Sequence, residues 1–248
     1  MLACPSCGAT YVRRLEHCGL DGHRLEEAPV PPLVGRTVDR YRIEEALGSG
    51  GMAIVYRAVH LNLEQSFALK ALHGEMASDH LIARRFEREA KVMSQLSHPN
   101  IVSVMDFGRT DGGLLYMVME YVRGPTLAEV MRSFGPLPPK RVADLSRQIA
   151  LGLERAHRSG FVHRDLKPQN VMLLGADDEE EHAKILDFGL VGLVEPESSS
   201  HTQLTTQGMF FGTPAYMSPE QISGGPVGPA SDLYALGVMM YAMLTGDL

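Results

Sequence analysis

The stretch that decides the fold is His163-Arg164-Asp165-Leu166-Lys167-Pro168-Gln169-Asn170, which is followed 17 residues later by Asp187-Phe188-Gly189. The two segments bring together carboxylates, cations and an amide. Chemistry that depends on positioning and charge neutralisation needs such groups around one cleft. The segments upstream of this stretch indicate which chemistry it serves.

A glycine-rich segment, Leu47–Val55, lies between two predicted strands. Its glycines allow backbone amides to approach phosphate oxygens closely. Taken alone, the segment fits a hairpin turn without a ligand better than a nucleotide-binding loop, because so short a motif often occurs by chance. The candidate nucleotide-covering residues are Leu47, Gly48, Ser49, Gly50, Gly51, Met52, Ala53 and Val55.

Lys70 follows Val55 by 15 residues and lies on an otherwise apolar predicted strand. The next helix has an apolar stripe that also contains Glu89. Its apolar members are Ile82, Phe86, Met93 and Leu96. A buried carboxylate needs a cationic partner, so we expect Lys70 and Glu89 to pair. The pair can have a structural role alone. Because it lies downstream of a glycine-rich turn, the alternative is that Lys70 also binds phosphate oxygens.

In order and spacing, these segments resemble the motifs of the protein kinase family. The resemblance covers about residues 41–248. Among protein kinases, the sequence looks most like the eukaryotic-type Ser/Thr kinases found in bacteria. It implies an α+β fold with two lobes. The N-lobe (41–121) would hold an antiparallel sheet of about five strands plus one helix, and the C-lobe (122–248) would be mainly helical.

The resemblance implies a catalytic role for each polar residue of the deciding stretch. Asp165 would orient the substrate hydroxyl and accept its proton, and Lys167 would neutralise the transferring phosphoryl group. Asn170 and Asp187 would hold Mg²⁺ on the phosphates of ATP. On the helix predicted to start at Ser231, Asp232 would brace the catalytic loop, His163–Asn170.

The resemblance also assigns the nucleotide contacts. Lys70, when paired with Glu89, would hold the α- and β-phosphates. The amides of residues 48–53 would cover the nucleotide. The residues implied around the adenine are Val55, Ala68, Met119, Glu120, Val122 and Met172.

Two further segments bear on the substrate class. Lys167 within Asp165–Asn170 resembles Ser/Thr kinases and not tyrosine kinases. The segment Gly212–Glu220 indicates the same class, with Thr213 beside the target residue. Protein substrates with Ser or Thr hydroxyls are therefore expected.

The segment from Asp187 to Glu220 carries several threonines and resembles the family's activation segment. Arg164 directly precedes the catalytic aspartate, and in this family such an arginine usually binds a phosphate on that segment. We therefore predict autophosphorylation there. The alternative is a solvated, Ser/Thr-rich loop. The candidate sites are Thr202, Thr205 and Thr206.

The composition is that of a globular protein, with 44% hydrophobic residues and a formal net charge of −7. This balance gives no uniform attraction to nucleic acid or anionic membranes. No apolar run is long enough to span a bilayer and no secretory signal is visible. The three cysteines do not suggest a disulfide framework, so a reducing, cytoplasmic setting is expected. The acidic run Asp177–Glu181 is predicted to be a solvated turn.

The first 25 residues form a separate cysteine-bearing segment. Cys4 and Cys7 form one knuckle-like turn, and Cys18 with Asp21 resembles a second zinc-ribbon knuckle in which aspartate replaces a cysteine. Zinc accepts carboxylate oxygen, so these four residues are the candidate ligands, with His17 or His23 as rival fourth ligands. A vestigial ribbon and a redox Cys-x-x-Cys are the alternatives.

A proline-rich stretch at 26–38 is predicted as a linker, so the domain organisation is 1–25, 26–38 and 39–248. Small departures from the family pattern are Ala53 for the third glycine and Ser218 for an alanine. The resemblance implies that the family's last helices are absent and that the C-lobe is incomplete at Leu248. The absent helices include the one whose arginine normally pairs with Glu220. Glu220 is therefore expected to lack a partner, and the activity of this chain alone is in question.

Two rival functions remain open from the sequence. One is a pseudokinase or scaffold that binds nucleotide without transfer, although such proteins usually lose the equivalents of Lys70, Asp165 or Asp187. The other makes the N-terminal ribbon the main unit, as a protein- or nucleic-acid-binding knuckle. Basic residues are sparse there, so nucleic acid is not expected as a partner. The sequence leaves the oligomeric state open.

Overall fold

The computed structural model describes residues 2–3, 10–11, 17, 22–24, 26–27, 33–49, 53–72, 79–175, 181–188 and 214–247. The chain divides into two compact units. Unit 1 comprises residues 1–90 and 104–121, and unit 2 comprises residues 91–103 and 122–248.

Unit 1 is built on an antiparallel sheet with the strand order β4-β5-β6-β7-β9-β8. The strands are β4 (Thr37–Val38), β5 (Tyr41–Ser49), β6 (Ala53–His60), β7 (Ser66–Leu72), β8 (Val104–Arg109) and β9 (Leu115–Glu120). The sequence predicted about five strands, and β4 is the addition. It lies in the range predicted as a linker, and two residues are too few to show an alternating pattern.

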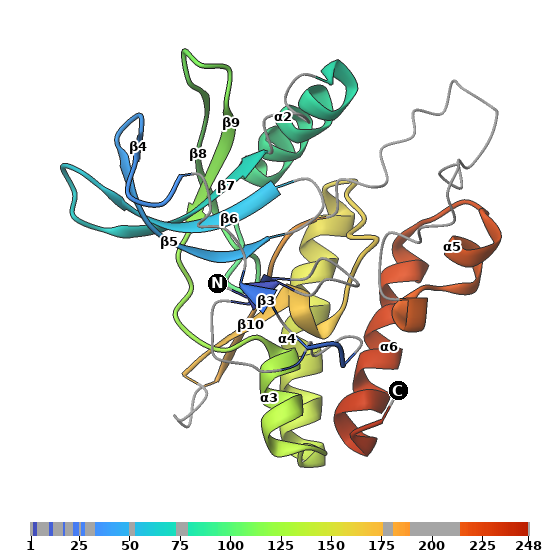
Figure 1. Cartoon of the computed structure of the whole chain (residues 1–248). Coiled ribbons are helices and arrows are strands. Elements are labelled where there is room, and N and C mark those ends of the chain that lie inside the picture. The colour runs from blue at the N-terminus through green and yellow to red at the C-terminus, as the bar shows by residue number, and fades with distance from the viewer. Residues whose placement is uncertain are drawn as a thin grey trace. The chain divides into compact units, whose positions relative to one another are not determined.

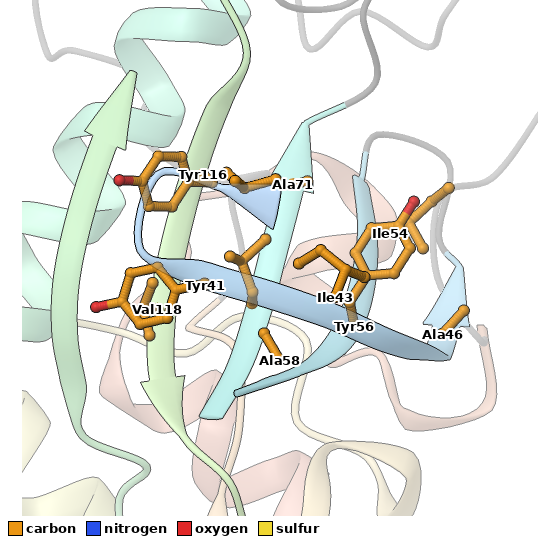
Figure 2. Packing of buried hydrophobic residues seen from close by; sticks show 11 residues of the cluster. Tyr41, Ile43, Ala46, Ile54, Tyr56, Ala58, Ala71, Tyr116 and Val118 are labelled. Carbon is orange, nitrogen blue, oxygen red and sulfur yellow. The ribbon is translucent and has the colours of Figure 1, made fainter. Parts of the chain in front are cut away.

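One face of this sheet carries the hydrophobic core of unit 1, which Figure 2 shows. Alternate side chains of β5 and β6 point into it, because successive residues of a strand face opposite sides of a sheet. Tyr41, Tyr56 and Tyr116 are its largest buried members, and the Tyr41 ring lies edge-on to Phe67 and Tyr116 at centroid distances of 5.9 and 6.3 Å. Burial of these aromatic rings is a major source of stability for the unit.

Helix α2 (His80–Gln95) packs beside the sheet, as Figure 1 shows. It begins directly after Asp79, whose carboxylate accepts the backbone N–H groups of Leu81 and Ile82 at 2.8 and 3.3 Å. An N-terminal cap of this kind satisfies amides that have no partner inside the helix. The predicted stripe is confirmed, since Phe86 and Glu89 are both buried.

Unit 2 is mainly helical. Its longer helices are α3 (Leu127–Phe134), α4 (Pro139–Arg158) and α6 (Pro229–Thr245), and its shorter elements are η1 (Pro168–Asn170), β10 (Val171–Leu174), β11 (His182–Ile185), η3 (Pro214–Tyr216) and α5 (Pro219–Ser223). Helices α4 and α6 lie side by side in Figure 1. Helix α4 ends at Arg158, and Gly160 follows with φ +81°, a conformation that favours glycine.

The β10–β11 hairpin is held against α4. Gly152 of α4 allows this approach, because a Cβ there would lie 3.1 Å from the Asn100 carbonyl oxygen and 2.9 Å from Ile185 Cδ1. Gln148 accepts the Ala183 N–H at 2.9 Å through its side-chain oxygen. Strand β11 ends two residues before Asp187, so these contacts also fix the position of the Asp187 backbone.

Glu181 corrects the prediction of a solvated acidic turn. Its carboxylate forms a two-pronged ion pair with Arg141 of α4, at 2.9 and 2.7 Å, and its side chain is only 14% exposed. The Glu181 hydrogen bond raises the pKa of Arg141. The other members of the acidic run lie outside the described residues. A pattern of like charges cannot reveal a partner 40 residues away.

The N-terminal residues include a small antiparallel sheet with the order β2-β1-β3. Its strands are β1 (Leu2–Ala3), β2 (Thr10–Tyr11) and β3 (Glu26–Glu27). An isolated antiparallel bridge joins His17 to Arg24. The four predicted zinc ligands, Cys4, Cys7, Cys18 and Asp21, lie outside the described residues.

Helix α6 is apolar on most of its circumference. Its buried side includes Met239 and Met243, while five large apolar side chains are exposed: Leu233, Tyr234, Met240, Tyr241 and Leu244. No helix among the described residues is both long and apolar enough to cross a membrane.

Candidate active site

Val55, Ala68 and Lys70 share the face of the unit 1 sheet opposite to the core in Figure 2. Val55 lies directly across from Lys70, and Ala68 is two residues before Lys70 on the same strand. Across the next pair of strands, Ala68 faces Met119. The sheet register therefore brings the side chains predicted for adenine and phosphate contacts in unit 1 onto one surface.

A β-bulge at Leu47 adds Gly48 to this surface. The pairing of β5 with β6 shifts between Ala46 and Gly48, so that Gly48 faces Val55. Without the bulge, Gly48 would share the core face with Ala46, because residues two apart lie on the same side of a strand. Gly50, Gly51 and Met52 lie outside the described residues.

The predicted pair of Lys70 and Glu89 is present. Lys70 Nζ lies 3.5 Å from Glu89 Oε1, and the two side chains are only 10% and 5% exposed. A buried charge without its counter-ion is strongly destabilising, so each residue fixes the other. The pair holds α2 at β7 and directs the Lys70 ammonium to a fixed position.

In unit 2, His163 is fully buried and organises the deciding stretch. Its Nε2 donates to the Leu186 carbonyl at 2.9 Å, which leaves Nδ1 to accept the Asp165 N–H at 3.3 Å. Burial lowers the pKa of His163, so the ring is neutral, as both contacts require. The ring also packs on Phe188, with centroids 4.9 Å apart.

The Asp165 carboxylate is held by two neighbours and remains 37% exposed. Lys167 Nζ donates to Asp165 Oδ2 at 2.8 Å, and the Asn170 amide nitrogen donates to the same oxygen at 3.3 Å. Asn170 also binds the Asp165 backbone carbonyl at 2.8 Å. The carboxylate is therefore oriented, charged and accessible, which suits a group that accepts a proton.

Asn170 and Asp187 fit a hard cation. Asn170 uses its side-chain nitrogen for Asp165, so its oxygen is directed elsewhere, and no described residue donates a hydrogen bond to that oxygen. The Leu186 N–H binds the Asn170 carbonyl at 2.8 Å and thereby brings Asp187 next to Asn170. Amide and carboxylate oxygens are the ligands Mg²⁺ prefers. The described residues contain no cluster of three or more His, Cys, Asp or Glu side chains suited to a metal.

Asp232 of α6 braces the deciding stretch. Its two carboxylate oxygens accept the backbone N–H groups of His163 and Arg164, both at 2.8 Å, and His157 Nε2 lies 2.7 Å from Oδ2. Asp232 is only 1% exposed. Arg164 has φ +66°, a left-handed conformation that is costly for a residue with a side chain. The two backbone bonds compensate for that strain next to Asp165.

The Arg164 guanidinium is half-buried and forms no ion pair with a described carboxylate. Burial lowers its pKa, although the charge of Asp232 acts in the opposite direction. A guanidinium held in this way is suited to bind an added anion. The candidate phosphorylation sites Thr202, Thr205 and Thr206 lie outside the described residues, as does Thr213.

Glu220, which was expected to lack its arginine partner, is half-buried and accepts a hydrogen bond from an uncharged donor. The Ser231 hydroxyl donates to its carboxylate, and this bond lowers the pKa of Glu220. A side chain from the start of α6 supplies the donor because α5 and α6 follow each other closely in the chain. Ser218, the other noted departure, caps α5.

The remaining predicted contacts come from the end of β9, the segment after it and β10. Glu120 is the last residue of β9, and Val122 is buried in unit 2. Met172 of β10 pairs with Thr126 in an isolated bridge. Gly124 permits this approach, because a Cβ there would lie 1.9 Å from the Leu173 carbonyl oxygen.

Two residues of the site were missed by the sequence analysis. His157 contacts Asp232, and Gln221 binds the Arg164 carbonyl at 2.6 Å. Neither residue belongs to a motif that was singled out. Both partners are distant in sequence, so no local pattern signals them.

Comparison with known proteins identifies the family. A family model described as protein kinase domain matches residues 41–248. Serine/threonine-protein kinase pkn3 of Myxococcus xanthus is 42% identical over 216 residues, which are 87% of this chain and 39% of that protein. PrkC of Bacillus subtilis is 40% identical over 217 residues, 87% of this chain and 32% of that protein. The chain thus spans well under half the length of these relatives.

A solved structure also matches. The kinase domain of PknI from Mycobacterium tuberculosis superposes with a TM-score of 0.65 at 32% identity, covering 86% of this chain and 77% of that one. The α+β kinase fold predicted from the sequence is confirmed.

Proposed function

The chain belongs to the protein kinase family and contains a serine/threonine kinase domain of the bacterial type, and on that basis we propose that it transfers the γ-phosphoryl group of ATP to Ser or Thr hydroxyls of proteins. The observation that carries the proposal is the oriented carboxylate of Asp165, bound by Lys167 and Asn170. All polar groups that this transfer requires are retained in the sequence.

Asp165 would position the substrate hydroxyl and accept its proton as the new O–P bond forms. Lys167, 2.8 Å from Asp165, would neutralise charge on the transferring group and hold the carboxylate in place. Bound Mg²⁺, held by Asn170 and Asp187, would neutralise the negative charge of the ATP phosphates.

Lys70 of unit 1 would hold the α- and β-phosphates, since its pair with Glu89 fixes the ammonium. Val55, Ala68 and Met119 support a contact with adenine, because they form one apolar surface around Lys70. Met172 and the backbone of Glu120 and Val122 complete the proposed nucleotide contacts.

We expect autophosphorylation in the segment between Asp187 and Glu220. The half-buried Arg164 supports this, since a phosphate there would supply the anion that the described residues do not. Incubation with Mg²⁺ and ATP should add one or more phosphates to the intact mass, mapped by peptide sequencing to Thr202, Thr205 or Thr206. Modification found only outside the segment would contradict this regulation but leave the kinase activity standing.

We also propose that the N-terminal segment binds one structural Zn²⁺ through Cys4, Cys7, Cys18 and Asp21, with the protein working in the reducing cytoplasm. The topology supports this, because residues 4–9 connect antiparallel β1 and β2, and residues 18–23 connect the bridged pair His17 and Arg24. The pairs Cys4 with Cys7 and Cys18 with Asp21 also have the two-residue spacing that is typical of structural zinc ligands.

The zinc proposal predicts about one zinc per chain, since a tetrahedral site binds a single ion. Elemental analysis of the purified chain checks this, and Cys7→Ser should release the metal while leaving kinase activity nearly unchanged. A content well below one in the unmodified chain would exclude the site. Asp21→Ala, with His17→Ala and His23→Ala as the rival variants, identifies the fourth ligand.

A further inference from the structure

Gln221, the third residue of α5, touches the loop that carries Asp165 although it lies 57 positions after Arg164. Its side-chain nitrogen donates to the Arg164 carbonyl at 2.6 Å, and its side-chain oxygen accepts the Ser218 N–H at 3.0 Å. Because a carbonyl only accepts and an N–H only donates, these two partners fix the orientation of the amide. One side chain thus joins the start of α5 to the catalytic loop.

The bonded carbonyl belongs to the peptide unit that joins Arg164 to Asp165. The N–H at the other end of the same unit donates to His163 Nδ1. Since a peptide unit is planar, two bonds at its opposite ends fix the direction in which the Asp165 Cα leaves it. Asp232 fixes the preceding unit through the Arg164 N–H.

We infer that Gln221 is a positioning residue for Asp165. Through its side chain, Gln221 couples α5 to the orientation of the proton-accepting carboxylate. The left-handed φ of Arg164 makes such support necessary, because a strained residue persists only where its surroundings over-determine it. Loss of the Gln221 bond would let the peptide unit rotate and misdirect Asp165. The inference rests on the proposed kinase activity.

An ordinary helix cap is the competing role, and it can be separated chemically. Ser218 and Gln221 form a capping box, in which the Ser218 hydroxyl also accepts the Gln221 N–H. A glutamate at this position would keep the capping box, since its carboxylate accepts the Ser218 N–H equally well. An ionised glutamate cannot donate to the Arg164 carbonyl. It would place one of its carboxylate oxygens against the Arg164 carbonyl oxygen.

The test compares Gln221→Glu and Gln221→Ala with the unmodified chain. If Gln221 positions Asp165, Gln221→Glu should be the worse variant, with kcat lowered roughly 10- to 100-fold and the KM for ATP within about twofold. A capping role alone predicts the reverse order, with Gln221→Glu like the unmodified chain. Thermal melting shows whether each variant folds.

A second measurement does not need turnover. Hydrogen exchange of the Arg164 and Asp165 amides should accelerate about tenfold in both variants if the contact orders the loop. Unchanged exchange together with unchanged kcat would overturn the inference. If the unmodified chain transfers no phosphate, the proposed function fails, and the exchange at these two amides still decides whether Gln221 orders the loop.

Discussion

Replacing Asp165 by asparagine is expected to lower phosphoryl transfer by about a thousandfold, since a positioned general base contributes roughly 10²- to 10⁴-fold. The substitution keeps the shape of the side chain and removes its charge. Asparagine cannot accept the hydroxyl proton, and it cannot form the ion pair that Lys167 makes at 2.8 Å. The measurement is the initial rate of phosphate incorporation with Mg²⁺ and ATP.

A matched control is Asp144→Asn, which makes the same chemical change at an exposed position of α4. Its rate should stay within about twofold, because surface substitutions away from a site have small effects. Nucleotide affinity should be nearly unchanged in Asp165→Asn, since the proposed phosphate contacts lie elsewhere. Equal rates for Asp165→Asn and the unmodified chain would exclude the proposed mechanism. An unmodified chain that binds ATP without transfer would favour the pseudokinase.

The Lys70–Glu89 pair shows what sequence patterns can predict. A charged residue on an apolar strand and another on an apolar helix stripe each require a partner, so solvation energy alone suggested the pair. The structure has it at 3.5 Å. The order of the motifs then indicated the family, and the family comparison confirms it.

The bulge at Leu47 shows what such patterns cannot predict. Gly48 was expected to approach phosphate, but its face of the sheet depends on a shift in pairing between β5 and β6. Alternation within one strand carries no information about its register with the next. The same limit hid β4, which is recognisable only by its pairing with Tyr41 and Arg42.

The contacts of Gln221 and His157 were hidden for a different reason. Each joins segments more than 50 positions apart, 57 for Gln221 with Arg164 and 75 for His157 with Asp232. Their side chains are compatible with many surroundings, so neither is out of place in its own helix. Asp232 was foreseen only through resemblance to the family, and its contact with His157 came from the structure.

Asp232→Asn is expected to lower the free energy of unfolding of unit 2 by about 3 kcal/mol, because a buried donor left without an acceptor costs ~1–3 kcal/mol. The carboxylate is 1% exposed and receives the N–H groups of His163 and Arg164 on separate oxygens. Asparagine offers one oxygen and turns an NH₂ group toward the other donor. Arg164 then loses the support of its left-handed conformation.

Urea unfolding measures this loss, with Asp144→Asn as the control that should change stability by less than ~0.5 kcal/mol. Exchange of the His163 and Arg164 amides should accelerate, and kcat should fall because the peptide units before Asp165 are released. His157→Phe separates the contributions, since the phenylalanine ring has no hydrogen-bond donor and the change therefore removes only the third contact of Asp232, so it should have the smaller effect on exchange. If Asp232→Asn kept the stability and the slow exchange of the unmodified chain, water or a local rearrangement would be satisfying the two amides, and Asp232 would not be what holds the catalytic loop.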